Sequence, residues 1–217
     1  MNFCQLRVYL YNRGMNDPEK DIIIDGAMKE EEILAQNPEN PAPQNILDSL
    51  EIIEVKYFGF DGRVHAGQIV MNRSIAREVE SFFALALELR FPIEKVMPIS
   101  NAKYRWNDEV SCGDNNSSGY NYRVILGTSR LSNHATGLAF DINPAQNIFI
   151  KYDKDMNEIY RVPKNGKYDK NISGTLTPEN PLVGHMKNLG WKWGGDWKPE
   201  EGRADYQHFE KPPISRI

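Results

Sequence analysis

Cysteine is almost absent from this chain, which has only Cys4 and Cys112 among its 217 residues. Two distant cysteines exclude both a disulfide framework of the kind found in small secreted proteins and a zinc knuckle built from cysteine ligands. Whether these two residues pair with each other stays open at this stage, and so does the redox compartment.

Long apolar runs are missing as well. No segment approaches the roughly 20 apolar residues that a membrane-spanning helix requires. The N-terminus, as it stands, lacks the basic region and apolar stretch of a secretory signal. The net charge of -4 gives no electrostatic attraction to nucleic acid. We therefore expect no transmembrane segment and no nucleic-acid partner.

The remaining composition is that of an ordinary globular protein, with 40% hydrophobic and 26% charged residues. Residues 1–48 read as an N-terminal extension with a short strand at 4–11, a polar helix at 26–36 and a proline-rich linker at 37–43. The main domain is expected to span residues 49–217 and is long enough for one sizeable core.

Alternating apolar residues predict a strand over 51–60, with Ile53, Val55 and Tyr57 on one face. Asp61-Gly62 is a strong hairpin signal and predicts a partner strand over 64–70. Ser74 could cap a helix that runs to Arg90 before Pro92. The apolar stripe predicted for this helix consists of Ile75, Val79, Phe82, Phe83, Ala86 and Leu89.

Two stretches look irregular, a polar loop over 101–121 and a second loop over 143–180. A short helix opening at Thr177-Pro178-Glu179, with Gly190 after its end, and strands over 191–193 and 206–210 complete the pattern. We expect an α+β fold in which a small antiparallel sheet is flanked by helices.

Three side chains have the chemistry of a metal site: His134, Asp141 and His208. In a strand over 137–142, period-two alternation puts Asp141 on the face opposite three large apolar residues. Gly137 allows the preceding turn to bring His134 back over that face. Two imidazoles and one carboxylate suit Zn²⁺ better than Ca²⁺ or Mg²⁺, and three protein ligands leave a position for water. Taken singly, each residue would more often be structural, in a polar turn, and it is the combination that favours a metal site.

A further carboxylate, Asp205, precedes His208 by three residues. Together with the pattern from Ser132 through His134 to Asp141, this spacing resembles the zinc D-alanyl-D-alanine carboxypeptidases of the M15 peptidase family. That family includes VanY- and VanX-type enzymes and phage L-alanyl-D-glutamate endolysins. The segments that carry the likeness are residues 58–67, 91–93, 114–123, 132–144, 191–197 and 205–210.

The resemblance implies a hedgehog/DD-peptidase-like fold over residues 49–217 and a zinc cofactor bound by His134, Asp141 and His208. It implies that Asp205 is the general base, although Asp205 could instead only orient His208. Arg123 would stabilise the oxyanion, unless it is an ordinary surface arginine. Ser132 would help to hold the substrate carboxylate, or it would only cap its turn.

The implied function is a zinc metallopeptidase that acts on peptidoglycan stem peptides, most simply as a carboxypeptidase that removes a terminal D-alanine. An endopeptidase of the L-alanyl-D-glutamate type and a catalytically silent zinc-binding module are the alternatives. A peptidoglycan substrate implies work in the cell envelope or outside the cell. Gly119 and Lys170 depart from the alanine and arginine common in relatives, which bears on the peptide recognised rather than on the metal.

Overall fold

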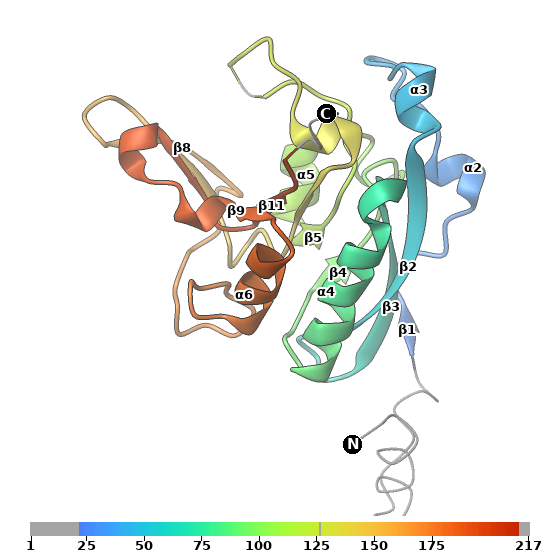
Figure 1. Ribbon diagram of the computed structural model, residues 1–217, viewed down its shortest axis with the longest axis horizontal. Coiled ribbons are helices and arrows are strands. Elements are labelled where there is room, and N and C mark those ends of the chain that lie inside the picture. The colour runs from blue at the N-terminus through green and yellow to red at the C-terminus, as the bar shows by residue number, and fades with distance from the viewer. Residues whose placement is uncertain (1–21, 126, 213–217) are drawn as a thin grey trace, which may run out of the picture.

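The computed structural model describes residues 22–125 and 127–212, and it shows an α+β fold with small sheets and few helices (Figure 1). The α+β class predicted from the sequence is thereby confirmed, while the hedgehog-type assignment stays a prediction. The strand expected at 4–11, which includes Cys4, lies outside the described residues.

The longest strands form the predicted hairpin, β2 (Leu50–Phe58) and β3 (Val64–Asn72), which pair in antiparallel register. Ile53, Val55 and Tyr57 are buried on one face, as their alternation predicts. Gly62 takes a φ of +80° in the connecting turn, a conformation that costs glycine little.

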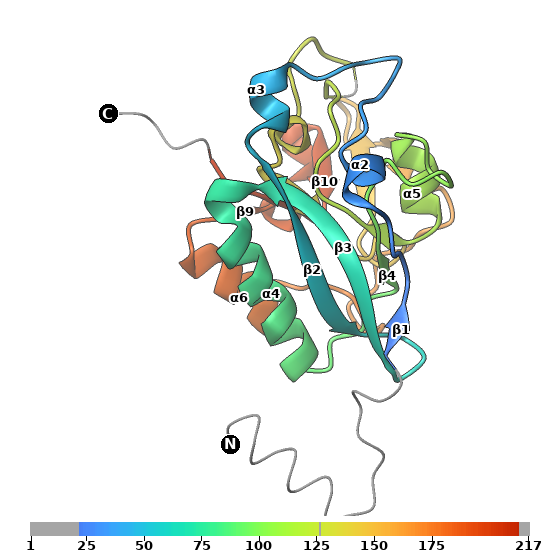
Figure 2. The same cartoon turned by 90° about the vertical axis from the view of Figure 1, so that its right-hand side faces the viewer.

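Helix α4 (Ala76–Glu88) packs along this hairpin, and α6 (Pro181–Asn188) lies beside α4 (Figure 2). The chain enters α4 through a 3₁₀ turn, η1 (Arg73–Ile75), and the cap is Asn72, whose side chain accepts a hydrogen bond from the backbone N–H of Ser74. The prediction that Ser74 is the cap was therefore wrong. Leu89 lies beyond the helix end and is exposed, although the rest of the predicted stripe is buried.

A second sheet, in the order β6–β11–β9, closes the core. Its strands are β6 (Ala139–Asp141), β11 (His208–Glu210) and β9 (Lys192–Trp193). Phe140 of β6 stacks on Phe209 of β11 with ring centroids 5.2 Å apart, and Phe82 of α4 meets both rings edge-on. The aromatic packing fixes the two strands that carry Asp141 and His208 against the main helix.

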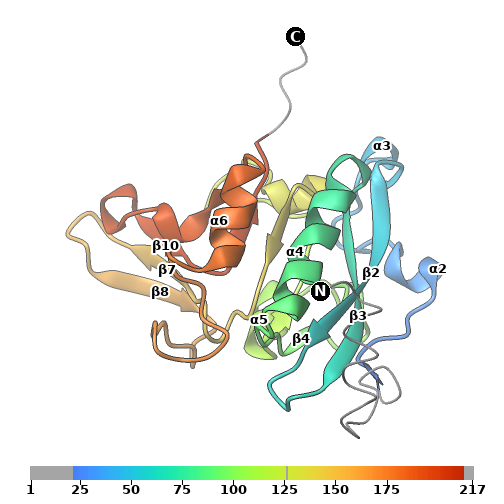
Figure 3. The same ribbon diagram turned by 60° about the horizontal axis from the view of Figure 1, so that its bottom comes forward.

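Both stretches predicted as irregular contain regular structure. The first holds α5 (Asp108–Gly113) and β5 (Asn116–Ser117), which pairs with β4 (Lys95–Val96). The second holds the hairpin of β7 (Phe149–Tyr152) and β8 (Glu158–Val162), and β10 (Arg203–Asp205) adds to its β7 edge. Figure 3 shows this sheet on the opposite side of the molecule from the layer of α4, β2 and β3.

Residues 22–48 contact the main domain along one edge. β1 (Ile23–Ile24) pairs in parallel with β3, and α2 (Glu30–Ile33) and α3 (Gln44–Leu47) follow it. The predicted helix at 26–36 is reduced to the single turn of α2. The Asp25 carboxylate accepts hydrogen bonds from Tyr57 and His65, and Ile33 and Ala42 pack in a small apolar cluster with Leu50. The domain boundary at residue 49 stays a prediction, but these contacts tie the segment before it to the sheet.

The described helices include none with the length and apolar character needed to cross a bilayer.

Replacing Phe82 by alanine should destabilise the protein by about 3–5 kcal/mol, because it leaves a cavity among fully packed aromatic rings. Leu89→Ala, at an exposed position near the end of the same helix, should change stability by no more than about 0.5 kcal/mol. Urea unfolding of both variants measures the difference. Equal effects would contradict the placement of Phe82 in the core.

Candidate metal centre

The sheet places two of the three predicted ligands directly opposite each other. In the antiparallel pair of β6 and β11, His208 is the register partner of Asp141, so their side chains share one face. His134 comes from the adjoining 3₁₀ turn η2 (Asn133–Thr136), which ends at Gly137 with a φ of +67°. A Cβ at Gly137 would lie 2.6 Å from the backbone nitrogen of Asn72, so glycine is required by both conformation and space.

All three side chains are buried, and their candidate ligand atoms lie within 4.8 Å of one another. His134 Nε2 is 3.1 Å from His208 Nδ1 and 3.3 Å from Asp141 Oδ2, while His208 Nδ1 is 3.0 Å from Asp141 Oδ1. Ligands at Zn²⁺ bond lengths of about 2.0–2.1 Å in tetrahedral geometry are separated by about 3.3 Å. The spacing of the donors therefore fits a zinc ion.

The hydrogen bonds at the far side of each ring define where its protons are. His134 Nδ1 lies 2.7 Å from the carbonyl oxygen of Gly119, which can only accept, so this nitrogen carries the proton. His208 Nε2 faces the Glu210 carboxylate at 3.4 Å and is likewise the donor. In the neutral rings, the two nitrogens that face each other are then both lone pairs, beside the carboxylate of Asp141. Three electron-rich atoms at this spacing favour a cation between them, either a metal ion or a proton on one of the facing nitrogens.

The pKa values of His208 and Asp141 also show that the buried cluster stabilises a positive charge next to the carboxylate. Burial alone lowers the pKa of His208, but hydrogen bonds to Asp141 and Glu210 outweigh it and raise the pKa to about 10. Burial raises the pKa of Asp141, but the charge of His134 and hydrogen bonds from both histidines hold it well below its usual range. The raised pKa means that His208 keeps a proton at neutral pH when no metal is bound. A metal ion would displace that proton, because histidine binds metals through a deprotonated nitrogen.

Asp205 is delivered by β10, whose backbone runs alongside β7. Its Oδ1 is buried and accepts no hydrogen bond from any described residue. Burial, reinforced by the charge of Asp141, raises the pKa of Asp205 to about 8, close to the range in which a general base works best. A Cβ at Gly194 would lie 2.4 Å from the Asp205 carbonyl oxygen, so glycine there permits the close packing behind this carboxylate.

Arg123 and Ser132 approach the cluster from the segment before η2. The guanidinium of Arg123 pairs with Asp108 at 2.9 Å, and its buried Nε has no hydrogen-bond partner among the described residues. Burial alone would lower the pKa of Arg123. The negative charges of Asp108, Asp141 and Asp205 outweigh burial, so the pKa is raised above its usual value. Ser132 accepts a hydrogen bond from the backbone N–H of His134 at 3.3 Å, which is the capping geometry. Its predicted substrate contact stays a prediction.

Sequence reasoning missed the groups that orient the ligands. The Gly119 carbonyl carries no sequence signal, because any residue supplies a carbonyl. Glu210, however, lies two residues after His208 on the same strand, so period-two alternation could have identified it. Asn133 donates a hydrogen bond of 2.7 Å to Glu210 and so fixes the carboxylate that fixes His208.

The tryptophans divide between the core and the site. Trp191 and Trp193 are buried in the core, which is the default expectation for them. Trp197 is partly exposed, with its ring centroid 5.5 Å from that of His208, and Arg203 stacks on it at 3.8 Å. Trp197 therefore forms a wall beside the proposed ligand.

Comparison with known proteins gives one finding about this segment. The family model described as D-alanyl-D-alanine carboxypeptidase matches residues 126–211. This match supports a relationship of residues 126–211 to the M15 peptidase family. The matched range contains His134, Asp141, Asp205 and His208, and the M15 relationship supports a peptidase, that is, a hydrolase. Searches of curated proteins and of solved structures found no match.

Gly119→Ala should weaken zinc binding by about 10–100-fold, because in this chain the added Cβ would displace the carbonyl group that orients His134. The added Cβ would lie 2.3 Å from the Met71 sulfur and 2.4 Å from the Val70 carbonyl oxygen, so the backbone must move. Gly184→Ala, where a Cβ meets open space, is the matched control. Competition with a fluorescent zinc chelator measures both, and equal affinities would show that the close approach is unimportant.

Glu210→Ala should also reduce zinc affinity by about 10–100-fold, because His208 loses the carboxylate that holds its outer nitrogen. Glu88→Ala, at an exposed position on α4, should leave affinity unchanged. Measuring the pH dependence of zinc binding adds a readout that simple destabilisation would not shift. Wild-type affinity in Glu210→Ala would exclude this positioning role.

Proposed function

We propose that this chain is a zinc metallopeptidase that hydrolyses peptidoglycan stem peptides, most simply by removing a terminal D-alanine. The observation that carries the proposal is the convergence of the His134, Asp141 and His208 donors, with Asp205 close by, whose buried Oδ1 has no hydrogen-bond partner among the described residues. The M15 family match supports the peptidase class and the substrate class.

His134, Asp141 and His208 would hold the ion, and their neutral imidazoles and carboxylate suit Zn²⁺. When bound there, zinc supplies Lewis-acid chemistry, lowering the pKa of a water molecule and polarising the peptide carbonyl. Asp205 takes a proton from the attacking water and returns it to the departing amine. Arg123 brings a fixed positive charge toward the oxyanion that develops on the carbonyl oxygen.

Two alternatives differ from this proposal in chemistry. An endopeptidase of the L-alanyl-D-glutamate type would use the same centre on a different bond. A silent zinc-binding module would need neither a buried base nor an arginine beside it, so Asp205 and Arg123 favour catalysis. By the same reasoning the protein would work in the cell envelope or outside the cell, where peptidoglycan is found.

Zinc-loaded protein incubated with defined stem tri-, tetra- and pentapeptides should release a single amino acid from one of them, as identified by mass spectrometry. Asp205→Asn should lower kcat by at least about 100-fold, the scale of general base catalysis, while it retains one zinc ion per chain. A chelator should abolish activity, and added zinc should restore it.

Lys198→Gln, an exposed change elsewhere in the same matched segment, is the control for nonspecific effects. Cleavage between L-alanine and D-glutamate would favour the endopeptidase. Absence of cleavage of any peptide by protein that holds one zinc ion would favour the binding module and contradict the proposal.

A further inference from the structure

A carboxylate from another segment holds the arginine of the proposed mechanism. Arg123 Nη2 lies 2.9 Å from Oδ2 of Asp108, the first residue of α5. The two side chains are 31% and 36% exposed, and ion pairs in contact with water contribute little to stability. The main physical effect of this pair is therefore to fix where the guanidinium lies.

Asp108 can act as an anchor because it is itself held in place. It begins α5, whose N-cap is Asn107, and its Oδ1 accepts a hydrogen bond from Asn121 Nδ2 at 3.3 Å. Asn121 is buried, and its backbone N–H donates to the carbonyl oxygen of His134 at 3.1 Å. The carboxylate that holds the arginine is thus connected to the turn that carries a proposed zinc ligand.

Two other carboxylates compete for the same guanidinium. The charges of Asp141 and Asp205 act on Arg123 together with that of Asp108, but Arg123 forms an ion pair only with Asp108 among the described residues. Asp141 is a proposed metal ligand, and Asp205 is the proposed base. An arginine released by Asp108 would be drawn toward these two buried carboxylates, since opposite charges attract strongly where little water screens them. It would then occupy groups that the reaction uses.

The pairing with Asp108 leaves hydrogen-bond donors of Arg123 available. A guanidinium has five N–H donors in one plane. Asp108 contacts Nη2, while the buried Nε has no hydrogen-bond partner among the described residues. A fixed donor that is unpaired before the reaction can bind a developing oxyanion without first breaking another bond.

We propose that Asp108 is a positioning residue, whose carboxylate holds the Arg123 guanidinium beside the metal centre and apart from Asp141 and Asp205, so that the arginine stabilises the oxyanion. This inference rests on the proposed function. Because the oxyanion develops only in the transition state, loss of Asp108 should lower kcat and leave KM nearly unchanged.

The test is a double-mutant cycle on zinc-loaded protein, with the stem peptide that the wild type cleaves. Asp108→Asn should lower kcat at least tenfold, with KM changed less than threefold and one zinc ion retained per chain. It should cause less than a twofold further loss when Arg123 is already replaced by alanine, because the two residues act as a unit. Asp108→Glu, which keeps the carboxylate, should recover part of the loss.

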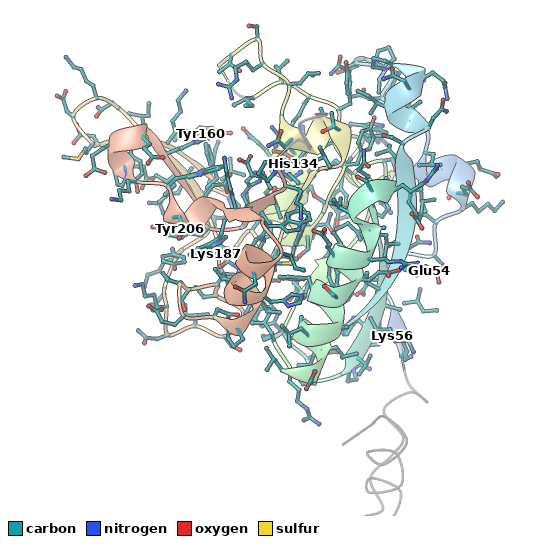
Figure 4. All side chains as sticks on the ribbon, viewed as in Figure 1. Glu54, Lys56, His134, Tyr160, Lys187 and Tyr206 are labelled. Carbon is teal, nitrogen blue, oxygen red and sulfur yellow. The ribbon has the colours of Figure 1, made fainter. Side chains whose placement is uncertain are left out.

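The next residue of α5 provides a matched control. Glu109 accepts a hydrogen bond from Tyr160, and Figure 4 shows Tyr160 on the β7–β8 hairpin and His134 on the neighbouring segment. Glu109→Gln removes the same charge from the same helix and keeps an oxygen that can accept this hydrogen bond. It should retain the wild-type kcat.

Wild-type kcat in Asp108→Asn would overturn the positioning role. An equal loss in the wild-type and Arg123→Ala backgrounds would overturn it as well, because that pattern indicates a general structural effect. If wild-type protein cleaves no stem peptide, the proposed function fails, and NMR of the Arg123 Nε–H decides the positioning independently of activity. This proton should exchange with water at least tenfold faster in Asp108→Asn than in the wild type or Asp108→Glu, and equal exchange in all three would refute the anchor.

Discussion

The structure depends on one electrostatic constraint, the meeting of three electron-rich atoms in a buried space. When both rings are neutral, His134 and His208 present lone pairs 3.1 Å apart beside the Asp141 carboxylate, because the acceptors at the outer nitrogens place the ring protons there. Such an arrangement is repulsive unless a proton or a metal ion lies between the atoms. Several features around the site, from the Gly119 carbonyl to Glu210, keep the donors in this arrangement.

Packing in the hydrophobic core holds the two strands that carry Asp141 and His208 in place. Phe140 and Phe209 lie next to Asp141 and His208 in sequence and stack against each other on the opposite face of the sheet. Their packing on α4 fixes the register that makes His208 the partner of Asp141. Packing energy in the core is thus coupled to ligand geometry, since each strand carries an anchoring ring and a ligand side by side.

The sequence was informative where local periodicity decides structure, and much less so elsewhere. The β2–β3 hairpin and the opposite faces of Phe140 and Asp141 follow from period-two alternation and one turn signal. The β7–β8 hairpin was missed because its strands are short and β8 is largely exposed, so little apolar contrast marks it. The contacts of Asp25 with His65, and of Gly119 with His134, join residues distant in sequence, and no local pattern encodes them.

X-ray absorption spectroscopy at the zinc edge tests the central claim most directly. One equivalent of zinc bound to the protein should show a four-coordinate shell of nitrogen and oxygen at about 2.0–2.1 Å, with two imidazoles resolved by their outer-shell scattering. His208→Ala should reduce the imidazole count to one. A sulfur shell, or an imidazole count that His208→Ala leaves unchanged, would contradict the assignment of this cluster as the metal centre.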